Sequence, residues 1–256
     1  MTEPTPRGRF VWFDLMTIDP DATHAFYSAV MGWSTTEWKG PAAYTMWTVG
    51  GEPIGGVTDL PTDVSSSPHW LAYIASMNVD ETVRQAEALG ARVIKGPYEI
   101  PTVGRFAVVA DPQGALFAVF TPVGNAPGHE GEARVGEFSW HELATHDYPA
   151  AYRFYERLFG WKKTSLMDMG AGGEYQMFGR NGIVLGGMFN RPAHMGSTPA
   201  WLHYVLVDDV HRAVKAVAAH GGKVVSGPME VPGGDWIAQC IDPQGAMFAV
   251  HARKTK

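Results

Sequence analysis

The amino-acid sequence predicts an α+β fold made of four βαβββ modules, arranged as two tandem halves of the chain. Three observations lead to this prediction. The chain repeats itself once, each half divides again into two similar patterns, and each pattern reads as a strand, a helix and three further strands. A repeat of this kind decides the architecture, because each copy folds as one structural unit.

A direct repeat relates the two halves. Residues 12–33 and 140–161 align at an offset of 128, with nine identities in 22 positions. Farther along the offset becomes 131, and Asp-Pro-Gln-Gly-Ala at 111–115 recurs unchanged at 242–246. We therefore predict domains at 8–122 and 136–253. The linker between them, 123–135, contains the turn-forming stretch Asn125-Ala-Pro-Gly.

The first module opens with an apolar, β-favouring segment at 10–16. Asp19 is a suitable N-cap, Pro20 suits the first helical position, and Gly32 is a suitable terminator after a helix with one apolar face. Short strands are expected at 44–49 and 53–58, with glycine-containing turns around them.

The second module repeats this order. We expect a strand at 70–76, a helix at about 80–89 that Gly90 ends, and strands around Val93, 106–110 and 116–120. Asp-Pro-Gln-Gly between the last two strands suits a type I turn, because proline presets the second position. The four modules are expected to begin near residues 8, 66, 136 and 198.

Composition excludes several classes of protein. The 256 residues carry a formal charge of −6 and no run of Lys or Arg, which argues against nucleic-acid or membrane-surface binding. The apolar share of 45% is enough for a substantial core. Cys240 is the single cysteine, and no stretch has the length of a signal peptide core or a membrane span, so we expect a cytoplasmic protein.

The motifs in these places resemble those of the vicinal oxygen chelate superfamily. They are Trp-x-[Asp/Glu]-Leu-x-Thr-x-Asp at 12–19 and 140–147, Phe-Tyr in the first helix of each half with Gly-Trp at its end, and the Asp-Pro-x-Gly turns. That superfamily includes glyoxalase I, extradiol dioxygenases and bleomycin-resistance proteins. The chain is most similar to tandem glyoxalase-like proteins of actinobacterial type that carry the label of hydroxylase. The resemblance implies curved mixed sheets that form half-open barrels, with the site inside them.

The resemblance also implies positions for metal ligands, and these carry unsuitable residues. The first-strand positions are Trp12 and Trp140, and the last strands of modules one and three read Gly-Gly at 55–56 and 186–187. The corresponding positions of modules two and four are apolar, at Leu71, Leu202, Ala118 and Ala249. The divalent metal ions of this superfamily need nitrogen or oxygen ligands. We therefore expect no metal and no other cofactor, although a one-residue shift would place His203 at a ligand position.

Strand alternation predicts which side chains share the ligand face. Asp14 and Glu142 lie two residues beyond the tryptophans. If Pro-Gln forms a two-residue hairpin loop, Arg105 and Trp236 face inward opposite Phe120 and His251. The candidate substrate-binding residues are Trp12, Asp14, Tyr73, Trp140, Tyr204, Trp236 and His251, and Glu142 is the candidate catalytic residue.

An acid among aromatic side chains can carry a proton, or it can hold the polar end of a ligand. Glu142 with His251 is the more enzyme-like pair, whereas we expect Asp14 to form an internal salt bridge with Arg105. Both acids could instead have purely structural roles, and both tryptophans could be core packing.

Three functions remain open. The preferred hypothesis is a metal-independent protein of the glyoxalase/bleomycin-resistance type that binds a small aromatic or amphipathic molecule, as a monomer or homodimer. The alternative is a lyase or isomerase with Glu142 as general acid/base, or a glyoxalase I-like enzyme with a rearranged metal site. A third is a scaffold with closed clefts that binds another protein, because one fold hosts many functions.

Overall fold

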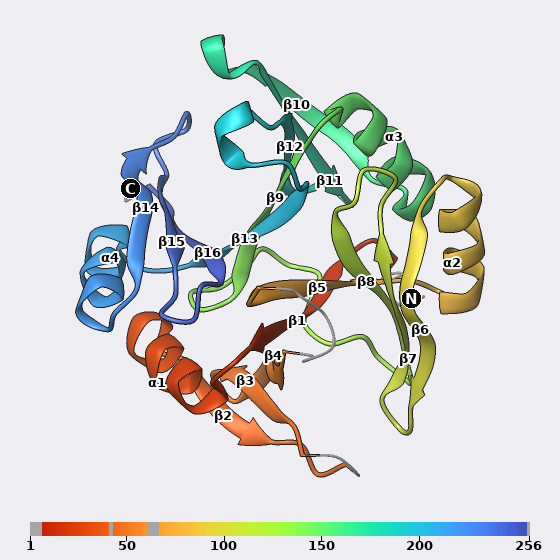
Figure 1. Cartoon of the computed structure of the whole chain (residues 1–256), viewed down its shortest axis with the longest axis horizontal. Helices are drawn as coiled ribbons and strands as arrows, with labels where there is room; N and C mark the ends of the chain where they lie inside the picture. Colours follow the sequence, from red (N-terminus) through yellow and green to blue (C-terminus); the bar gives the residue numbers. More distant parts are fainter. Residues whose placement is uncertain (1–6, 41–42, 61–66, 255–256) are drawn as a thin grey trace. The chain divides into compact units, whose positions relative to one another are not determined.

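The fold consists of two eight-stranded mixed sheets with helices packed against them (Figure 1). The computed structural model describes residues 7–40, 43–60 and 67–254. This is the α+β arrangement of repeated βαβββ modules that the sequence predicts. The expected start of the second module, near residue 66, lies outside the described residues.

Modules one and two form the first half. Module one contains β1 (Phe10–Thr17), α1 (Pro20–Met31), β2 (Ser34–Glu37), β3 (Thr45–Val49) and β4 (Glu52–Asp59). Module two contains β5 (His69–Ala75), α2 (Val79–Ala88), β6 (Arg92–Ile100), β7 (Gly104–Ala110) and β8 (Leu116–Pro122).

Modules three and four repeat this order. Module three contains β9 (Phe138–Thr145), α3 (Tyr148–Phe159), β10 (Lys162–Asp168), β11 (Glu174–Arg180) and β12 (Ile183–Asn190), with short 3₁₀ turns at Gly170–Gly172 and Ala193–Met195. Module four contains β13 (Ala200–Leu206), α4 (Val210–Ala219), β14 (Lys223–Glu230), β15 (Trp236–Ile241) and β16 (Met247–Ala252).

The two sheets have the same topology. Their strand orders are β2-β3-β4-β1-β5-β8-β7-β6 and β10-β11-β12-β9-β13-β16-β15-β14. Within each module the first and last strands pair in parallel, as β1 with β4 and β5 with β8, and the other neighbours are antiparallel. Each sheet therefore contains both modules of one half, and neither closes into a barrel.

Local capping determines where the first helix of each half begins and ends. The Asp19 side chain accepts a hydrogen bond from the Ala22 N–H, and Gly32 ends α1 with a positive φ of 72°. Asp147 and Gly160 do the same for α3. The capping predicted for α1 from Asp19, Pro20 and Gly32 is confirmed, because these contacts need only neighbouring residues.

Tertiary contacts divide the chain into two compact units, and each unit combines modules from different halves. Unit 1 contains residues up to Val11, 72–131 and 141–201, which is mainly modules two and three. Unit 2 contains 12–71, 132–140 and 202–256, which is mainly modules one and four. The domain bounds 8–122 and 136–253 are defined by the repeat, and they stay a prediction.

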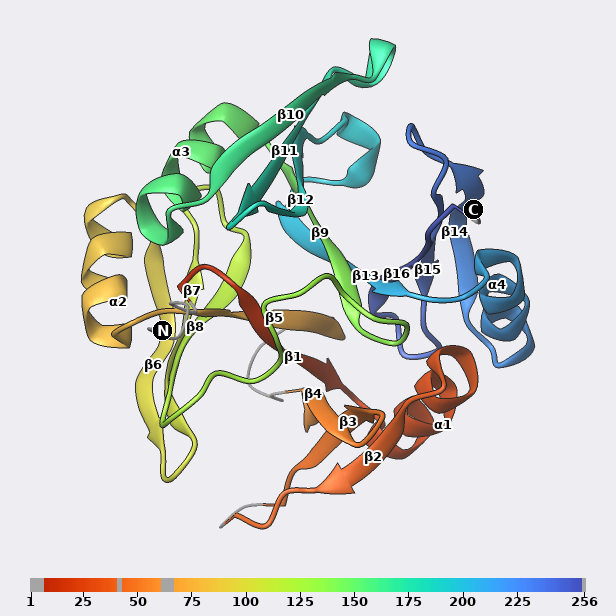
Figure 2. The same cartoon turned by 180° about the vertical axis from the view of Figure 1, so that it is seen from behind.

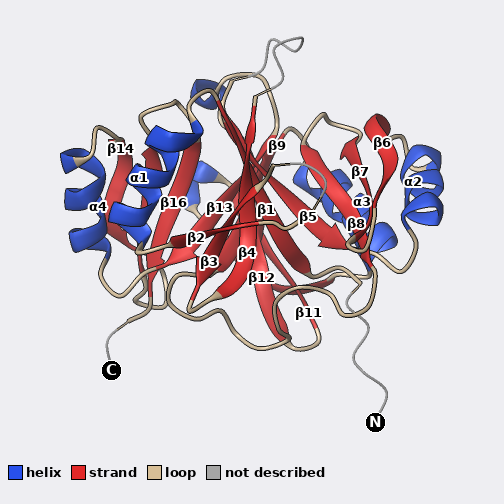
Figure 3. Ribbon diagram, turned by 90° about the horizontal axis from the view of Figure 1, so that it is seen from below, coloured by secondary structure: helices blue, strands red, loops and turns tan. Residues whose placement is uncertain are grey.

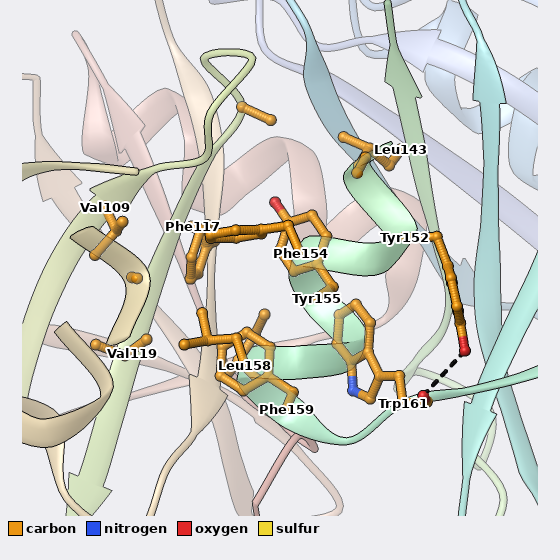
Figure 4. Close-up of a cluster of buried hydrophobic side chains, with 14 of the residues drawn as sticks. Val109, Phe117, Val119, Leu143, Tyr152, Phe154, Tyr155, Leu158, Phe159 and Trp161 are labelled. Carbon is orange, nitrogen blue, oxygen red and sulfur yellow. Dashed lines mark hydrogen bonds between the residues drawn. The ribbon is translucent and has the colours of Figure 1, made fainter. Parts of the chain in front are cut away.

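The core of unit 1 lies between α3 and the sheet strands β7 and β8 (Figure 4). Aromatic side chains of α3 fill it, and Tyr155 and Trp161 stack with ring centroids 5.3 Å apart. Helix α2 packs against α3 and β6, as Figures 2 and 3 show. On the α3 side the core includes Phe154, Tyr155, Leu158, Phe159 and Trp161, and on the strand side Val109, Phe117 and Val119.

A buried polar chain joins the two modules of unit 1. Tyr155 Oη donates to Asp111 Oδ2 at 3.1 Å and accepts from Trp201 Nε1 at 3.1 Å. Burial and the neighbouring Asp111 carboxylate raise the pKa of Tyr155 well above its usual value. The Phe-Tyr and Asp-Pro-Gln-Gly motifs therefore contact each other, although 44 residues separate Tyr155 from Asp111.

Unit 2 contains the equivalent chain. Tyr27 Oη donates to Asp242 Oδ2 and accepts from Trp70 Nε1, both at 3.1 Å. In this unit α1 packs against α4 (Figure 1). The rings of Phe26 and Tyr27 on α1 contact the ring of Phe248. No helix in the described part of the chain is long and apolar enough to cross a membrane.

Candidate functional site

Module one places an acid, a phenol and an indole together in unit 2. Trp12 Nε1 donates to Asp14 Oδ1 at 2.9 Å and lies 2.8 Å from Tyr44 Oη. Tyr44 Oη donates to the same Asp14 oxygen at 2.5 Å. Asp14 is 6% exposed, so its carboxylate is buried and held by two neutral donors. Two hydrogen-bond donors therefore meet at one oxygen of a buried acid.

Module three repeats the pairing of acid and phenol in unit 1. Tyr175 Oη donates to Glu142 Oε2 at 3.0 Å. The Tyr175 ring stacks on Phe189 of β12, with centroids 5.9 Å apart and an interplanar angle of 23°. Glu142 is only half-buried, in contrast to Asp14. A ligand can therefore approach the acid of module three more easily than the acid of module one.

The glycine pairs of β4 and β12 make room for these tyrosines. Gly56 lies beside Asp14 in the β1–β4 pairing, and Gly187 lies beside Glu142 in the β9–β12 pairing. A Cβ built on Gly56 would lie 2.0 Å from Tyr44 Oη, and one built on Gly187 would lie 1.9 Å from Tyr175 Cε1. A side chain at either position would therefore displace the tyrosine.

The chemistry at these positions does not fit a metal ion. The last-strand ligand positions of modules one and three are glycines covered by phenol rings, and the other ligand positions are Trp, Leu and Ala. Within the described residues, no group of three or more His, Cys, Asp and Glu side chains could hold a metal. His203, the alternative ligand, lies in the core of unit 2 with its ring centroid 5.4 Å from that of Phe13.

Sequence reasoning missed Tyr44 and Tyr175. Both stand in the repeated pattern Tyr-x-Met, at 44–46 and 175–177, with the offset of 131 that relates the later parts of the two halves. That repeat was a usable signal. The repeat alone does not show that these tyrosines lie near the acids. That becomes clear only from the strand pairing, in which β3 lies beside β4 and β11 lies beside β12.

The hairpin between β7 and β8 has one more loop residue than we predicted. The Asp111 carbonyl accepts from the Gly114 N–H at 3.0 Å, as in the expected turn, but Asp111 N–H also donates to the Ala115 carbonyl at 2.9 Å. Gly114 has a φ of 104°, so the loop is a type I turn followed by a bulge residue. The repeated turn at 242–246 has the same bonds.

This extra residue corrects the predicted facing of Arg105 and Trp236. Phe106, not Arg105, lies opposite Phe120, and Ile237, not Trp236, lies opposite His251. A shift of one residue moves every side chain of a strand to the other face.

The expected salt bridge between Asp14 and Arg105 is also wrong. Arg105 makes two hydrogen bonds to Asp80, both of 2.9 Å, at the start of α2. These bonds and the positive charge of Arg105 lower the pKa of Asp80. Asp14 is held instead by Trp12 and Tyr44.

The remaining predicted residues lie in separate surroundings. Tyr73 is buried against Phe106 and Phe120 of module two. Tyr204 is also buried, and its Oη accepts from Gln239 Nε2 at 3.0 Å. Trp236 is half-buried with its ring 4.7 Å from that of His211, and Trp140 is half-buried on β9.

His251 is held at both ring nitrogens. Its Nδ1 lies 3.0 Å from Ser139 Oγ, and its Nε2 lies 3.0 Å from Asp235 Oδ2. Neither Ser139 nor Asp235 was a candidate from the sequence. The predicted pairing of Glu142 with His251 stays a prediction.

Four βαβββ modules, two mixed eight-stranded sheets and the repeated first-strand motif define the class of protein. The chain belongs to the glyoxalase/bleomycin resistance protein/dioxygenase superfamily, as the resemblance implied. The model of that superfamily matches residues 137–250, and the model of a glyoxalase-like domain matches residues 11–120.

Known proteins of similar sequence and structure agree with this class. The chain is 30% identical to the anthracycline biosynthesis protein DauV of Streptomyces sp. (strain C5), over 98% of this chain and 94% of that protein. The Mn(II)-bound glyoxalase of Novosphingobium aromaticivorans is 17% identical with a TM-score of 0.65, over 98% of this chain and 83% of that one. The 2,3-dioxygenase LapB of Pseudomonas sp. KL28 is 12% identical with a TM-score of 0.69, over 98% and 94%. The two structures establish likeness of fold.

Proposed function

We propose that this protein binds a small aromatic or amphipathic molecule with hydroxyl or keto groups, and that Glu142 and Tyr175 hold its polar end without a metal ion. One observation carries the proposal. The Tyr175 phenol, which donates a hydrogen bond to the Glu142 carboxylate, covers Gly187, a position where the superfamily resemblance implies a metal ligand.

The chemistry of this pair supports an aromatic ligand with polar groups. A carboxylate accepts hydrogen bonds from hydroxyl groups, while the aromatic rings of Tyr175 and Phe189 offer flat apolar contact. Small-molecule sites commonly combine apolar walls with a few placed polar groups. The relative DauV is named for anthracycline biosynthesis, which is consistent with a fused-ring aromatic ligand.

The experiment uses quinizarin, a planar dihydroxyanthraquinone, as the probe and follows quenching of tryptophan fluorescence. We expect Glu142→Gln to weaken binding about tenfold or more, since hydrogen bonds to charged groups contribute about 1.5–3 kcal/mol. Asp14→Asn is the matched variant in the other half, and it should weaken binding less because Asp14 is buried beneath Trp12 and Tyr44.

Each other outcome has a defined meaning. Equal losses in the two variants would indicate two equivalent sites. Undiminished binding by a folded Glu142→Gln protein would reject Glu142 as the polar anchor.

The alternative function is a lyase or isomerase in which Glu142 moves a proton. Glu142 is half-buried, and the Tyr175 hydroxyl donates a hydrogen bond to its carboxylate, so the pair could take up and return a proton. Turnover of a bound ligand that Glu142→Gln abolishes without loss of affinity would favour this enzyme.

A glyoxalase I-like enzyme with a rearranged metal site is tested separately. Protein purified without added metal should contain less than stoichiometric Ni, Zn, Fe or Mn by elemental analysis. The hemithioacetal of methylglyoxal and glutathione should not be converted. Metal-dependent conversion would overturn the proposal of a metal-independent binding protein.

We also propose that the protein acts in the cytoplasm as a monomer or homodimer and binds no nucleic acid, consistent with its charge of −6. Sedimentation analysis and cell fractionation test these points.

A further inference from the structure

A serine, a histidine and an aspartate form a hydrogen-bonded chain in unit 2, apart from the pair of Glu142 and Tyr175. Ser139 on β9 lies with its Oγ 3.0 Å from His251 Nδ1 on β16. His251 Nε2 lies 3.0 Å from Asp235 Oδ2, just before β15. The other Asp235 oxygen accepts from the Lys254 backbone N–H at 2.8 Å.

The carboxylate determines how the protons are placed along this chain. An ionised carboxylate only accepts hydrogen bonds, so His251 Nε2 carries a proton and donates it to Asp235. In the neutral ring, Nδ1 is then an acceptor and receives the hydroxyl proton of Ser139. Burial opposes ionisation of Asp235, but hydrogen bonds from His251 and Lys254 outweigh it and lower the pKa of the carboxyl.

The aspartate–histidine–serine order is the arrangement that activates a serine nucleophile. Because both nitrogens of His251 are occupied, the end of the chain that can react with a ligand is Ser139 Oγ. The hydroxyl also lies 3.3 Å from the Tyr204 carbonyl, a longer contact than the one to His251.

The other half of the protein shows that the fold does not need this chain. Ser139, Asp235 and His251 correspond through the repeat to Val11, Gly104 and Phe120. All three positions of the first half lack a polar side chain, yet β1, β7 and β8 form there as β9, β15 and β16 do in the second half. The polar chain is therefore an addition specific to the second half.

We propose that Ser139 is a nucleophile, activated by His251 and Asp235, that accepts an acyl group from an aryl ester. Ser139 Oγ forms a bond to the ester carbonyl carbon, and its proton passes to His251 Nδ1. The bond between that carbon and the phenol oxygen breaks, and the phenolate takes the proton from His251. Water then attacks the acyl-serine with His251 as base, which releases the carboxylic acid and restores the hydroxyl.

The surroundings of His251 suit a flat leaving group. The strand register places Ile237 directly opposite His251, and Ala249 precedes it by two residues on the same face. Ala249 and its ladder partner Tyr204 are buried, so the half-buried Ile237 provides the apolar side chain that a ring can contact. An aryl ester offers both an activated carbonyl and a ring that can contact Ile237.

The test uses 4-nitrophenyl acetate with the full-length protein. We expect a burst of 4-nitrophenolate and one acetyl group, which peptide mapping by mass spectrometry assigns to Ser139. Ser139→Val should remove the acetyl group entirely while the protein stays folded, because valine stands at the equivalent position of the first half. His251→Gln and Asp235→Asn should slow acetylation at least about tenfold, since a positioned base contributes about 10²–10⁴ in rate.

Ser165→Ala is the control variant. Ser165 is an exposed serine that donates a hydrogen bond to the Met177 sulfur and has no imidazole partner among the described side chains, so its loss should leave the burst unchanged. Acetylation of residues other than Ser139, or an unchanged burst in folded Ser139→Val protein, would overturn the proposal. An acetyl-Ser139 that forms equally fast in His251→Gln would show that the chain does not activate the serine.

Discussion

The buried imidazole of His203 should make the protein less stable in acid. His203 lies on β13 in the core of unit 2 with 2% of its surface exposed, near the rings of Phe13 and Phe138. Burial lowers its pKa from 6.5 to about 3. As the pH falls below 6.5, the unfolded chain takes up a proton at this residue before the folded protein does. The contribution of neutral His203 to stability is therefore complete above pH 6.5 and declines toward pH 3.

The size of the effect follows from the two pKa values. One pKa unit corresponds to about 1.36 kcal/mol. Between pH 8 and pH 5 the unfolded imidazole becomes almost fully protonated while the folded one stays neutral. This difference removes about 2 kcal/mol from the free energy of unfolding, which is a large share of the total stability of an ordinary domain.

Two variants separate titration from packing. His203→Phe is apolar and His203→Gln is polar, so they differ in how they fill the core, but neither titrates. Urea unfolding is followed by tryptophan fluorescence at pH 8 and pH 5. The stability advantage of the wild type over each variant should shrink by about 2 kcal/mol at the lower pH. An advantage that is the same at both pH values, or an NMR titration of His203 near pH 6.5, would refute the reasoning.

Three further substitutions test particular contacts. Tyr155→Phe removes the hydroxyl between Asp111 and Trp201, and urea unfolding should show a loss of about 1–3 kcal/mol; no loss would mean that the bond contributes nothing net. Gly187→Ala places a Cβ against the ring of Tyr175, so fluorescence quenching should show weaker quinizarin binding; wild-type affinity would show that the position of this ring does not matter for binding. Gly114→Ala forces an alanine to a φ of 104° without a steric contact, and thermal unfolding should report a cost of about 1–3 kcal/mol; an unchanged Tm would contradict the turn geometry.

Local patterns made much of the fold predictable. Asp19, Pro20 and Gly32 marked the ends of the first helix because a cap needs only residues within one turn. The repeated Asp-Pro-Gln-Gly marked a hairpin for the same reason, and the duplication itself identified the four modules. The bulge at Gly114 was not predicted, because the sequence Asp-Pro-Gln-Gly is compatible with a hairpin loop of two residues and with one of three. That single residue moved Arg105 and Trp236 off the predicted face.

The sequence by itself determined the order of the modules, the capping of their first helices and the unsuitability of Trp12 and the glycine pairs as metal ligands. The tertiary structure alone decided that modules two and three share one compact unit and modules one and four the other. It also decided that Tyr175 bonds to Glu142 and that Ser139 meets His251, which are 112 residues apart. The physical reason is the distance along the chain over which each signal acts. Periodicity and turn preferences depend on residues that are close in sequence. Contacts between distant strands depend on how the sheets pair, and neither strand encodes that pairing alone.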